Sequence, residues 1–153
     1  MPSLVSRTAA GPVPVHTAEE RRNLATILAL RRATVEGRRA FLAPGCRVHR
    51  HGMAHLAARG GFTDGGGYTA DSIADRHDHI EDIVAKGDRV WAIWTIRGTH
   101  TGPLFGIEPT GKPLDTLELG IWRLTDGKVV EAWFFADEYG LAEALGLGVP
   151  GGA

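Results

Sequence analysis

The sequence lacks the features that mark disulfide-rich secreted proteins and membrane proteins. Its single cysteine, Cys46, excludes an internal disulfide, so a reducing cytoplasm is the expected compartment. The longest apolar run near the start, residues 24–30, is far shorter than the roughly 20 residues of a membrane span. No basic segment followed by an apolar core opens the chain, so we expect no secretory signal.

The chain also lacks a large excess of charge of either sign. The chain has 17 Lys and Arg against 18 Asp and Glu, a net charge of −1 with its seven His neutral. Such a balance requires no basic patch, so nucleic acid is not an expected partner. Its 153 residues, 43% hydrophobic and 23% charged, suit one globular domain with a real core. We therefore expect a small protein that binds neither nucleic acid nor membrane.

Helical patterns lie in the first part of the chain. Residues 1–16 show no periodicity and predict a flexible arm. Thr17 and Glu20 have the spacing of a capping box, and apolar residues at helical spacing follow, with arginines such as Arg31 available for the solvent side. Gly37 interrupts this pattern. A short turn is expected at residues 38–42.

The rest of the chain is mostly of β type. We predict a short strand at 46–51, a mobile glycine-rich loop at 60–67 and a short helix at 69–75. Further strands are predicted at residues 78–85, 90–97, 114–124 and 128–136, and a closing helix at 138–145. Helices that lead and strands that follow favour an α+β fold with a mainly antiparallel sheet.

The Asp126-Gly127 pair predicts a two-residue hairpin loop, which sets a register for the strands beside it. With Thr125 opposite Lys128, one face carries Thr116, Glu118, Gly120, Trp122, Glu131, Trp133, Phe135 and Asp137. The other face carries Leu117, Leu119, Ile121, Arg123, Val130, Ala132, Phe134 and Ala136. Aromatic rings mixed with carboxylates fit a pocket for a small organic molecule. Alternatively, these carboxylates lie near strand ends or pair with arginine.

Several ordered motifs then become recognisable. They are Gly-Asp-Arg-Val at 87–90, Arg-Gly-Thr-His-Thr-Gly at 97–102, Gly-Ile-x-Pro-Thr-Gly-Lys at 106–112, and a longer pattern through 121–147. Together they resemble the SnoaL-like polyketide cyclase family, of the nuclear-transport-factor-like superfamily. The resemblance implies a cone-shaped α+β barrel, with a curved sheet wrapped by about three helices around an internal pocket. The resemblance covers about residues 78–147, and we expect one domain at residues 17–147 with a tail at 148–153.

The family's activity is an intramolecular aldol closure of a polyketide ester without metal or organic cofactor. The resemblance thus implies an acid/base enzyme, acting by this or a related dehydration or isomerisation on a polyketide-like or other polycyclic carbonyl compound. Asp137 occupies the place of the family's catalytic aspartate, and His51 is expected to assist it. The alternative for Asp137 is to cap the final helix. We expect the small hydrophobic substrate to contact Glu118, Trp122, Trp133, Phe135, His49 and His100.

The resemblance also implies a homodimer formed through the outer sheet face, for which we predict Leu117, Leu119, Ile121 and Phe134. Glu131 is expected to be structural and to pair with Arg97 or Arg123.

Two other functions remain open. An epoxide-hydrolase-like site would need an arginine flanked by two aspartates, and Arg97 with Asp137 supplies only part of it, since Thr99 stands where a second aspartate is wanted. The second open function is that of a dimeric module that binds a ligand without catalysis. His77 and His79 have the i, i+2 spacing at which two histidines of a strand can chelate a metal ion. No third ligand has a sequence spacing that indicates a metal site, so no metal site is expected.

Overall fold

The computed structural model describes residues 15–34, 36–50, 72–104 and 107–146. His51, the stretch 60–67, the tail 148–153 and most of the N-terminal arm lie outside these residues. None of the helices within them is both long enough and apolar enough to span a membrane.

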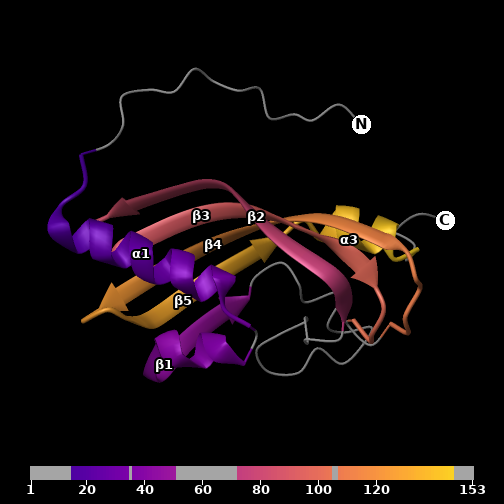
Figure 1. The fold of residues 1–153 in the computed structure, drawn as a ribbon, viewed down its shortest axis with the longest axis horizontal. Coiled ribbons are helices and arrows are strands. Elements are labelled where there is room, and N and C mark those ends of the chain that lie inside the picture. The colour runs from indigo at the N-terminus through magenta and orange to yellow at the C-terminus, as the bar shows by residue number, and fades with distance from the viewer. Residues whose placement is uncertain (1–14, 35, 51–71, 105–106, 147–153) are drawn as a thin grey trace.

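A curved, open five-stranded sheet forms the frame of the molecule (Figure 1). Its strands are β1 (Leu42–Arg50), β2 (Ile73–Lys86), β3 (Arg89–His100), β4 (Pro113–Thr125) and β5 (Lys128–Ala136). The helices are α1 (Ala18–Arg32), the short 3₁₀ helix η1 (Gly37–Phe41) and α3 (Glu138–Ala144). The strand order is β1-β5-β4-β3-β2, with β1 parallel to β5 and all other neighbours antiparallel.

The α+β class and the mainly antiparallel sheet are therefore confirmed. Two details differ from the prediction: in the described part of the chain the sheet is open, and two α-helices and one 3₁₀ helix take the place of three helices. The helix expected at 69–75 is wrong from residue 73 onward, because β2 already begins there and pairs with the end of β3.

The predicted capping box at the start of α1 is confirmed. The Thr17 hydroxyl accepts a hydrogen bond from the Glu20 N–H at 3.1 Å, and the Glu20 carboxylate accepts one from the Thr17 N–H at 2.9 Å. The second Glu20 oxygen accepts from the Gly87 N–H at 2.8 Å, in the turn between β2 and β3. These backbone bonds, first that from Gly87, lower the pKa of Glu20 and fix the start of α1 to the sheet.

The Asp126-Gly127 hairpin loop is also confirmed, but the register beyond it is not the predicted one. Both loop residues have positive φ, 49° and 72°, and Thr125 pairs with Lys128. Leu124 then pairs with Val129 while Arg123 pairs with Glu131, so β5 contains a bulge with one extra residue.

Beyond this bulge every predicted partner is displaced by one residue. Trp122 lies opposite Ala132, Gly120 opposite Phe134 and Glu118 opposite Ala136, instead of Glu131, Trp133 and Phe135. Because successive strand residues point to opposite faces, a one-residue shift moves each β5 side chain to the other side of the sheet.

The bulge therefore decides which aromatic rings are inside. Phe134 packs edge-on against Trp94 and Trp122, with ring centroids 6.2 and 5.7 Å apart. Trp133 and Phe135 lie on the opposite, outer face. Their predicted place beside Glu118 is wrong, as is the predicted place of Phe134 on the outer face.

Gly120 lies directly under this aromatic group. A Cβ atom built on Gly120 would stand 2.6 Å from the Trp122 ring and 2.8 Å from the Trp94 ring, and real Cβ atoms do not approach other atoms so closely. Both tryptophans are fully buried. The two indoles thus need a residue without a side chain on the strand beneath them.

We predict that Gly120→Ala destabilises the protein by about 1–3 kcal/mol, because two buried rings must move to admit the methyl group. Urea unfolding followed by tryptophan fluorescence measures the change. Gly37→Ala is the matched control, since Gly37 is exposed at the start of η1 and, among the described residues, its new Cβ would meet only the Thr34 and Ala33 side chains. Equal stability of Gly120→Ala and wild type would contradict the packing described here.

Candidate functional site

Helix α1 covers the inner face of the sheet and places an arginine on it. Ile27, Leu30 and Arg31 of this helix are buried, and the Arg31 guanidinium lies 3.9 Å from the centre of the Trp94 ring. Figure 1 shows α1 lying across the sheet. Arg31 was expected on the solvent side, and that prediction is wrong. Its position four residues after Ile27, on the same side of the helix, is the signal that could have placed it inside.

Four polar residues gather at this point of the inner face, and we name them the inner polar cluster. They are Arg31, Trp94, Thr116 and Glu118. Glu118 lies directly opposite Trp94 across β3 and β4, and Thr116 is the next residue of β4 on the same face. The carboxylate of Glu118 is close enough to favour the charged form of Arg31. Glu118 and Trp122 are thus the predicted substrate contacts that the structure places on the inner face near one another.

The inner polar cluster has unused hydrogen-bonding capacity. Arg31 Nε, Trp94 Nε1 and Thr116 Oγ1 are buried and have no hydrogen-bond partner within the described part of the chain. Since buried polar atoms are almost always hydrogen-bonded, such a group of atoms marks a place for water or for polar atoms of a ligand. Aromatic rings of Trp94, Trp122 and Phe134 stand beside it, as in pockets for small organic molecules.

Three arginines surround a single carboxylate beside this cluster. Arg31 and Arg76 both donate to Asp78, Arg76 through two bonds of 2.7 and 3.0 Å, and Arg38 lies 3.6 Å from the same carboxylate. We call Arg31, Arg38, Arg76 and Asp78 the arginine cluster. It joins α1, η1 and β2. Burial, and then the charge of Arg38, lower the pKa of Arg31 to about 10, so Arg31 remains charged at neutral pH.

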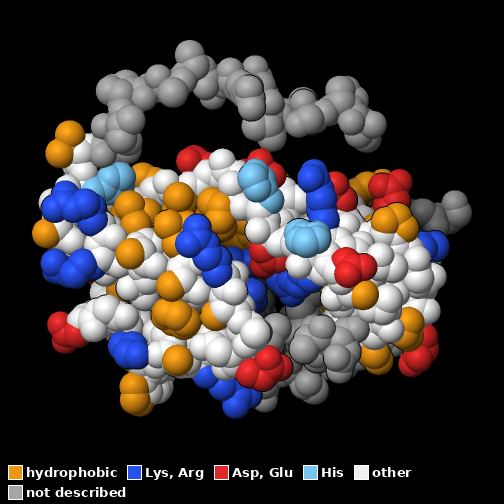
Figure 2. Space-filling model, viewed as in Figure 1, with side chains coloured by type: hydrophobic (Ala, Val, Ile, Leu, Met, Phe, Trp, Pro, Cys, Tyr) orange, Lys and Arg blue, Asp and Glu red, His pale blue; other side chains and the backbone are white. Residues whose placement is uncertain are grey.

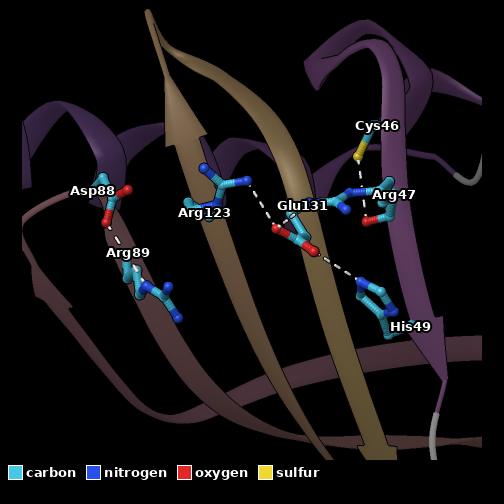
Figure 3. Close-up of polar contacts among 7 residues, drawn as sticks. All are labelled: Cys46, Arg47, His49, Asp88, Arg89, Arg123 and Glu131. Carbon is cyan, nitrogen blue, oxygen red and sulfur yellow. Dashed lines mark hydrogen bonds and ion pairs between the residues drawn. The ribbon is translucent and has the colours of Figure 1, made fainter.

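A second polar group lies on the outer face of the sheet, and Figure 3 shows it. We call it the outer carboxylate cluster. Glu131 Oε1 is 2.9 Å from His49 Nε2, while Oε2 accepts a hydrogen bond from Arg123 at 2.8 Å and forms an ion pair with Arg47 at 3.0 Å. The predicted pairing of Glu131 with Arg123 is confirmed, whereas Arg97 pairs with Asp115 on the surface.

His49 belongs to this outer group, since it also stacks on Trp133 with ring centroids 5.4 Å apart. The bonds to His49 and Arg123 and the charge of Arg47 lower the pKa of Glu131 to about 2. The cluster therefore joins β1, β4 and β5 as a structural element. His51, the predicted catalytic histidine, lies outside the described residues.

Asp137 ends β5 and caps α3. Its carboxylate accepts a hydrogen bond from the Gly140 N–H at 2.9 Å, so the capping alternative is confirmed. The side chain is exposed, whereas the predicted register placed it on the pocket face beyond Trp133 and Phe135. A catalytic role of Asp137 stays a prediction.

His100 is fully buried at the far end of the inner face. Its Nδ1 accepts a hydrogen bond from the Thr110 N–H at 3.2 Å, which holds the connection between β3 and β4. Its Nε2 has no partner within the described residues. His100 is thus structural on one side and has an unused polar atom on the other.

No group of three or more His, Cys, Asp or Glu side chains is placed to hold a metal ion in the described part of the chain. His77 and His79 are exposed, and Asp78 between them is taken up by the arginine cluster.

The model of the SnoaL-like polyketide cyclase family matches residues 21–145, which is most of the chain. The protein belongs to the SnoaL-like polyketide cyclase family. The resemblance read from the sequence motifs is confirmed. No curated protein matches this SnoaL-like chain.

Solved structures of similar proteins share the fold. A proposed SnoaL-like polyketide cyclase of Jannaschia sp. CCS1 is 21% identical, with a TM-score of 0.71 over 90% of this chain and 100% of its own. AclR, a proposed hydroxylase of Streptomyces galilaeus, is 25% identical, with a TM-score of 0.62 over 86% of this chain and 83% of its own. IdmH, a proposed polyketide cyclase of Streptomyces antibioticus, is 25% identical, with a TM-score of 0.58 over 82% of this chain and 99% of its own.

We predict that the outer carboxylate cluster makes this SnoaL-like protein sensitive to acid. The pKa of Glu131 in the folded protein, about 2, lies below its ordinary value of 4.5, so its interactions stabilise the fold fully above pH 4.5 and are lost as pH falls toward 2. Glu131→Gln should be less stable than wild type at neutral pH, and the two should converge in acid. Urea unfolding over this pH range tests it.

Glu143→Gln, at an exposed position of α3, is the matched control and should follow the wild-type pH dependence. A constant difference between Glu131→Gln and wild type at every pH would show that ionisation of Glu131 does not stabilise the fold.

Proposed function

We propose that this SnoaL-like protein is an acid/base enzyme that acts on a polyketide-like or other polycyclic carbonyl compound. The reaction would be an intramolecular aldol closure, or a related dehydration or isomerisation, with no metal or organic cofactor. The supporting observation is the inner polar cluster: a buried carboxylate, Glu118, beside buried donors of Arg31 and Trp94 that lack partners in the described part of the chain.

The chemistry needs a base and a stabiliser for negative charge. In an aldol closure, a base removes a proton α to a carbonyl, and the resulting enolate attacks a second carbonyl within the same molecule. Glu118 is placed to take this proton, while the N–H groups of Arg31 and Trp94 donate to the oxygen on which charge develops. The protonated Glu118 then returns the proton to the new alkoxide, which balances the reaction.

Asp137 is the second carboxylate of the proposal, with His51 as its predicted assistant. Its exposed position and its capping bond favour Glu118 as the base. Substitution can distinguish the roles of Glu118 and Asp137, because Asn is as good a helix N-cap as Asp. Asp137→Asn thus removes the titratable group and keeps the start of α3.

We predict that wild-type protein accelerates the ring opening of 5-nitrobenzisoxazole, a small aromatic probe in which a base removes one proton as the N–O bond breaks. Glu118→Gln should lose on the order of 10²–10⁴-fold of this rate, the usual share of a general base, and Asp137→Asn should keep it. Absorbance of the phenolate product measures the rate, and tryptophan fluorescence checks that each variant is folded.

The reverse result would make Asp137 the base, as the sequence resemblance implies. A wild-type rate no greater than that of acetate buffer would contradict acid/base catalysis and support the non-catalytic binding module.

Epoxide hydrolysis is the second candidate, and one observation favours it. Arg31 interacts with two carboxylates, since it binds Asp78 and the charge of Glu118 favours its charged form. The predicted centre at Arg97 has less support, because Arg97 is exposed and pairs with Asp115. Hydrolysis of styrene oxide that depends on both Asp78 and Glu118, without ring opening of the benzisoxazole, would favour this second candidate.

We also propose that two copies associate through the outer face. Four large apolar side chains there are 37–45% exposed: Trp91, Ile93, Leu117 and Phe135. We call them the outer apolar patch. They lie on three adjacent strands, with Ile93 and Phe135 flanking Leu119 in one row across the sheet. A contiguous apolar patch of this kind is typical of a protein–protein contact. In this proposal Phe135 replaces Phe134, which the predicted register had placed in the dimer contact.

We predict that wild type is a dimer at micromolar concentration and that Leu117→Glu converts it to a monomer, because the new charge would be buried without a partner. Light scattering measures the mass. Val15→Glu adds the same charge at a 98% exposed apolar residue outside the patch and should leave the dimer intact. A monomeric wild-type protein would exclude this association.

A further inference from the structure

Thr116 is the member of the inner polar cluster that has no role in the proposed reaction. It is 3% exposed, and its Oγ1 atom has no hydrogen-bond partner within the described residues. Figure 2 shows the side of the molecule on which α1 lies, where hydrophobic and charged side chains occur together. The Thr116 hydroxyl is buried, so it is shielded from bulk water. A buried hydroxyl of this kind requires bound water or a polar atom of a ligand.

Strand pairing places hydrogen-bonding groups in two directions from Glu118. Thr116 and Glu118 are two residues apart on β4, so their side chains point to the same face, and their Cα atoms are about 7 Å apart. Trp94 lies directly opposite Glu118 on β3, whereas Thr116 lies opposite Ile96. The Glu118 carboxylate therefore has a hydroxyl along its own strand and an indole N–H across the neighbouring strand.

This arrangement suits an enolate that carries its charge on two oxygens. A compound with one carbonyl places the developing charge on a single oxygen, to which the N–H groups of Arg31 and Trp94 can donate. A 1,3-dicarbonyl compound places the charge on two oxygens, one on either side of the carbon that loses the proton. With this carbon at Glu118, one oxygen can accept from Trp94 and Arg31 and the other from the Thr116 hydroxyl.

We propose that Thr116 is a specificity-determining residue that selects a 1,3-dicarbonyl compound as the carbon acid. Glu118 takes the proton from the carbon between the two carbonyl groups, the C–H electron pair is delocalised onto both oxygens, and Thr116 donates to the second oxygen. This inference rests on the proposed function for the role of Glu118. It adds a substrate class, because a compound with one carbonyl offers the buried Thr116 hydroxyl no acceptor and binds less tightly.

Calorimetry with a matched pair of ligands tests this selection. The probes are 1-(2-naphthyl)butane-1,3-dione and 1-(2-naphthyl)butan-1-one, which has the same rings and chain but one carbonyl, each titrated into the full chain. Wild type should bind the diketone on the order of tenfold more tightly than the monoketone, the share of one hydrogen bond to a charged oxygen. Thr116→Val should remove most of this preference, because valine has nearly the same shape as threonine and no hydroxyl.

Three further variants serve as checks. Thr116→Ala also removes the hydroxyl, without a second methyl group to repack, and should behave as Thr116→Val does. Thr116→Ser keeps the hydroxyl and should retain the preference for the diketone. Thr95→Val is the matched control, because it removes a buried hydroxyl of β3 that donates to Glu81 at 2.6 Å and lies on the outer face, opposite Leu117. It should keep the preference even if it lowers stability.

Absorbance of the bound diketone gives a second readout. Donors at both oxygens favour the enolate, so the pH at which half of the bound diketone is ionised should be about one pH unit higher in Thr116→Val than in wild type, the equivalent of a tenfold change. If Thr116 only supported the packing, its loss would weaken the binding of both ligands equally and leave this midpoint unchanged.

Equal binding of the two ligands by wild type would overturn the inference, and so would an unchanged preference in both Thr116→Val and Thr116→Ala. A loss of preference in Thr95→Val equal to that in Thr116→Val would overturn it as well. Equal binding together with Glu118-dependent benzisoxazole opening overturns only this inference. A Thr116-dependent preference for the diketone without that ring opening overturns only the proposed function.

Discussion

The bulge in β5 is the constraint on which the two faces of this sheet depend. One extra residue between the partners of Leu124 and Arg123 moves Phe134 inside and Trp133 and Phe135 outside. The inner face can then hold a packed aromatic group with Glu118 beside it. The same displacement puts Glu131 outside, where Arg47, His49 and Arg123 surround it. Both clusters thus follow from one local irregularity in strand pairing.

Arg31 has a comparable role between the helix and the sheet. It comes from the last turn of α1, contacts the Trp94 ring, and binds Asp78 of the edge strand β2. A buried guanidinium is costly unless it is paired, and here the cost is offset by Asp78 and by the charge of Glu118. The helix position is therefore coupled to the chemistry of the inner face.

The two faces of the sheet carry different groups of side chains. Carboxylate, donors and aromatic rings are on the inner face, while the apolar patch and a closed ion-pair network are on the outer face. This arrangement explains why the two carboxylates of the β4–β5 hairpin, Glu118 and Glu131, have such different surroundings. Glu131 is saturated with partners, whereas Glu118 lies among donors that lack partners in the described part of the chain. Saturation suits a structural residue, and unused donors suit a place where a ligand binds.

By itself, the sequence determined the local structure and the family. Thr17 and Glu20 define the start of α1, Asp126 and Gly127 define the hairpin, and the motifs from residue 87 onward identify the SnoaL-like family, because caps and tight turns depend on residues close together in the chain. Only the tertiary structure decided the site. A bulge leaves no clear pattern in one strand, since it depends on pairing with its neighbour, and the contacts of Arg31 join residues 47 and 63 positions apart. Such contacts depend on how the sheet curves beneath the helix, and local sequence does not encode that curvature.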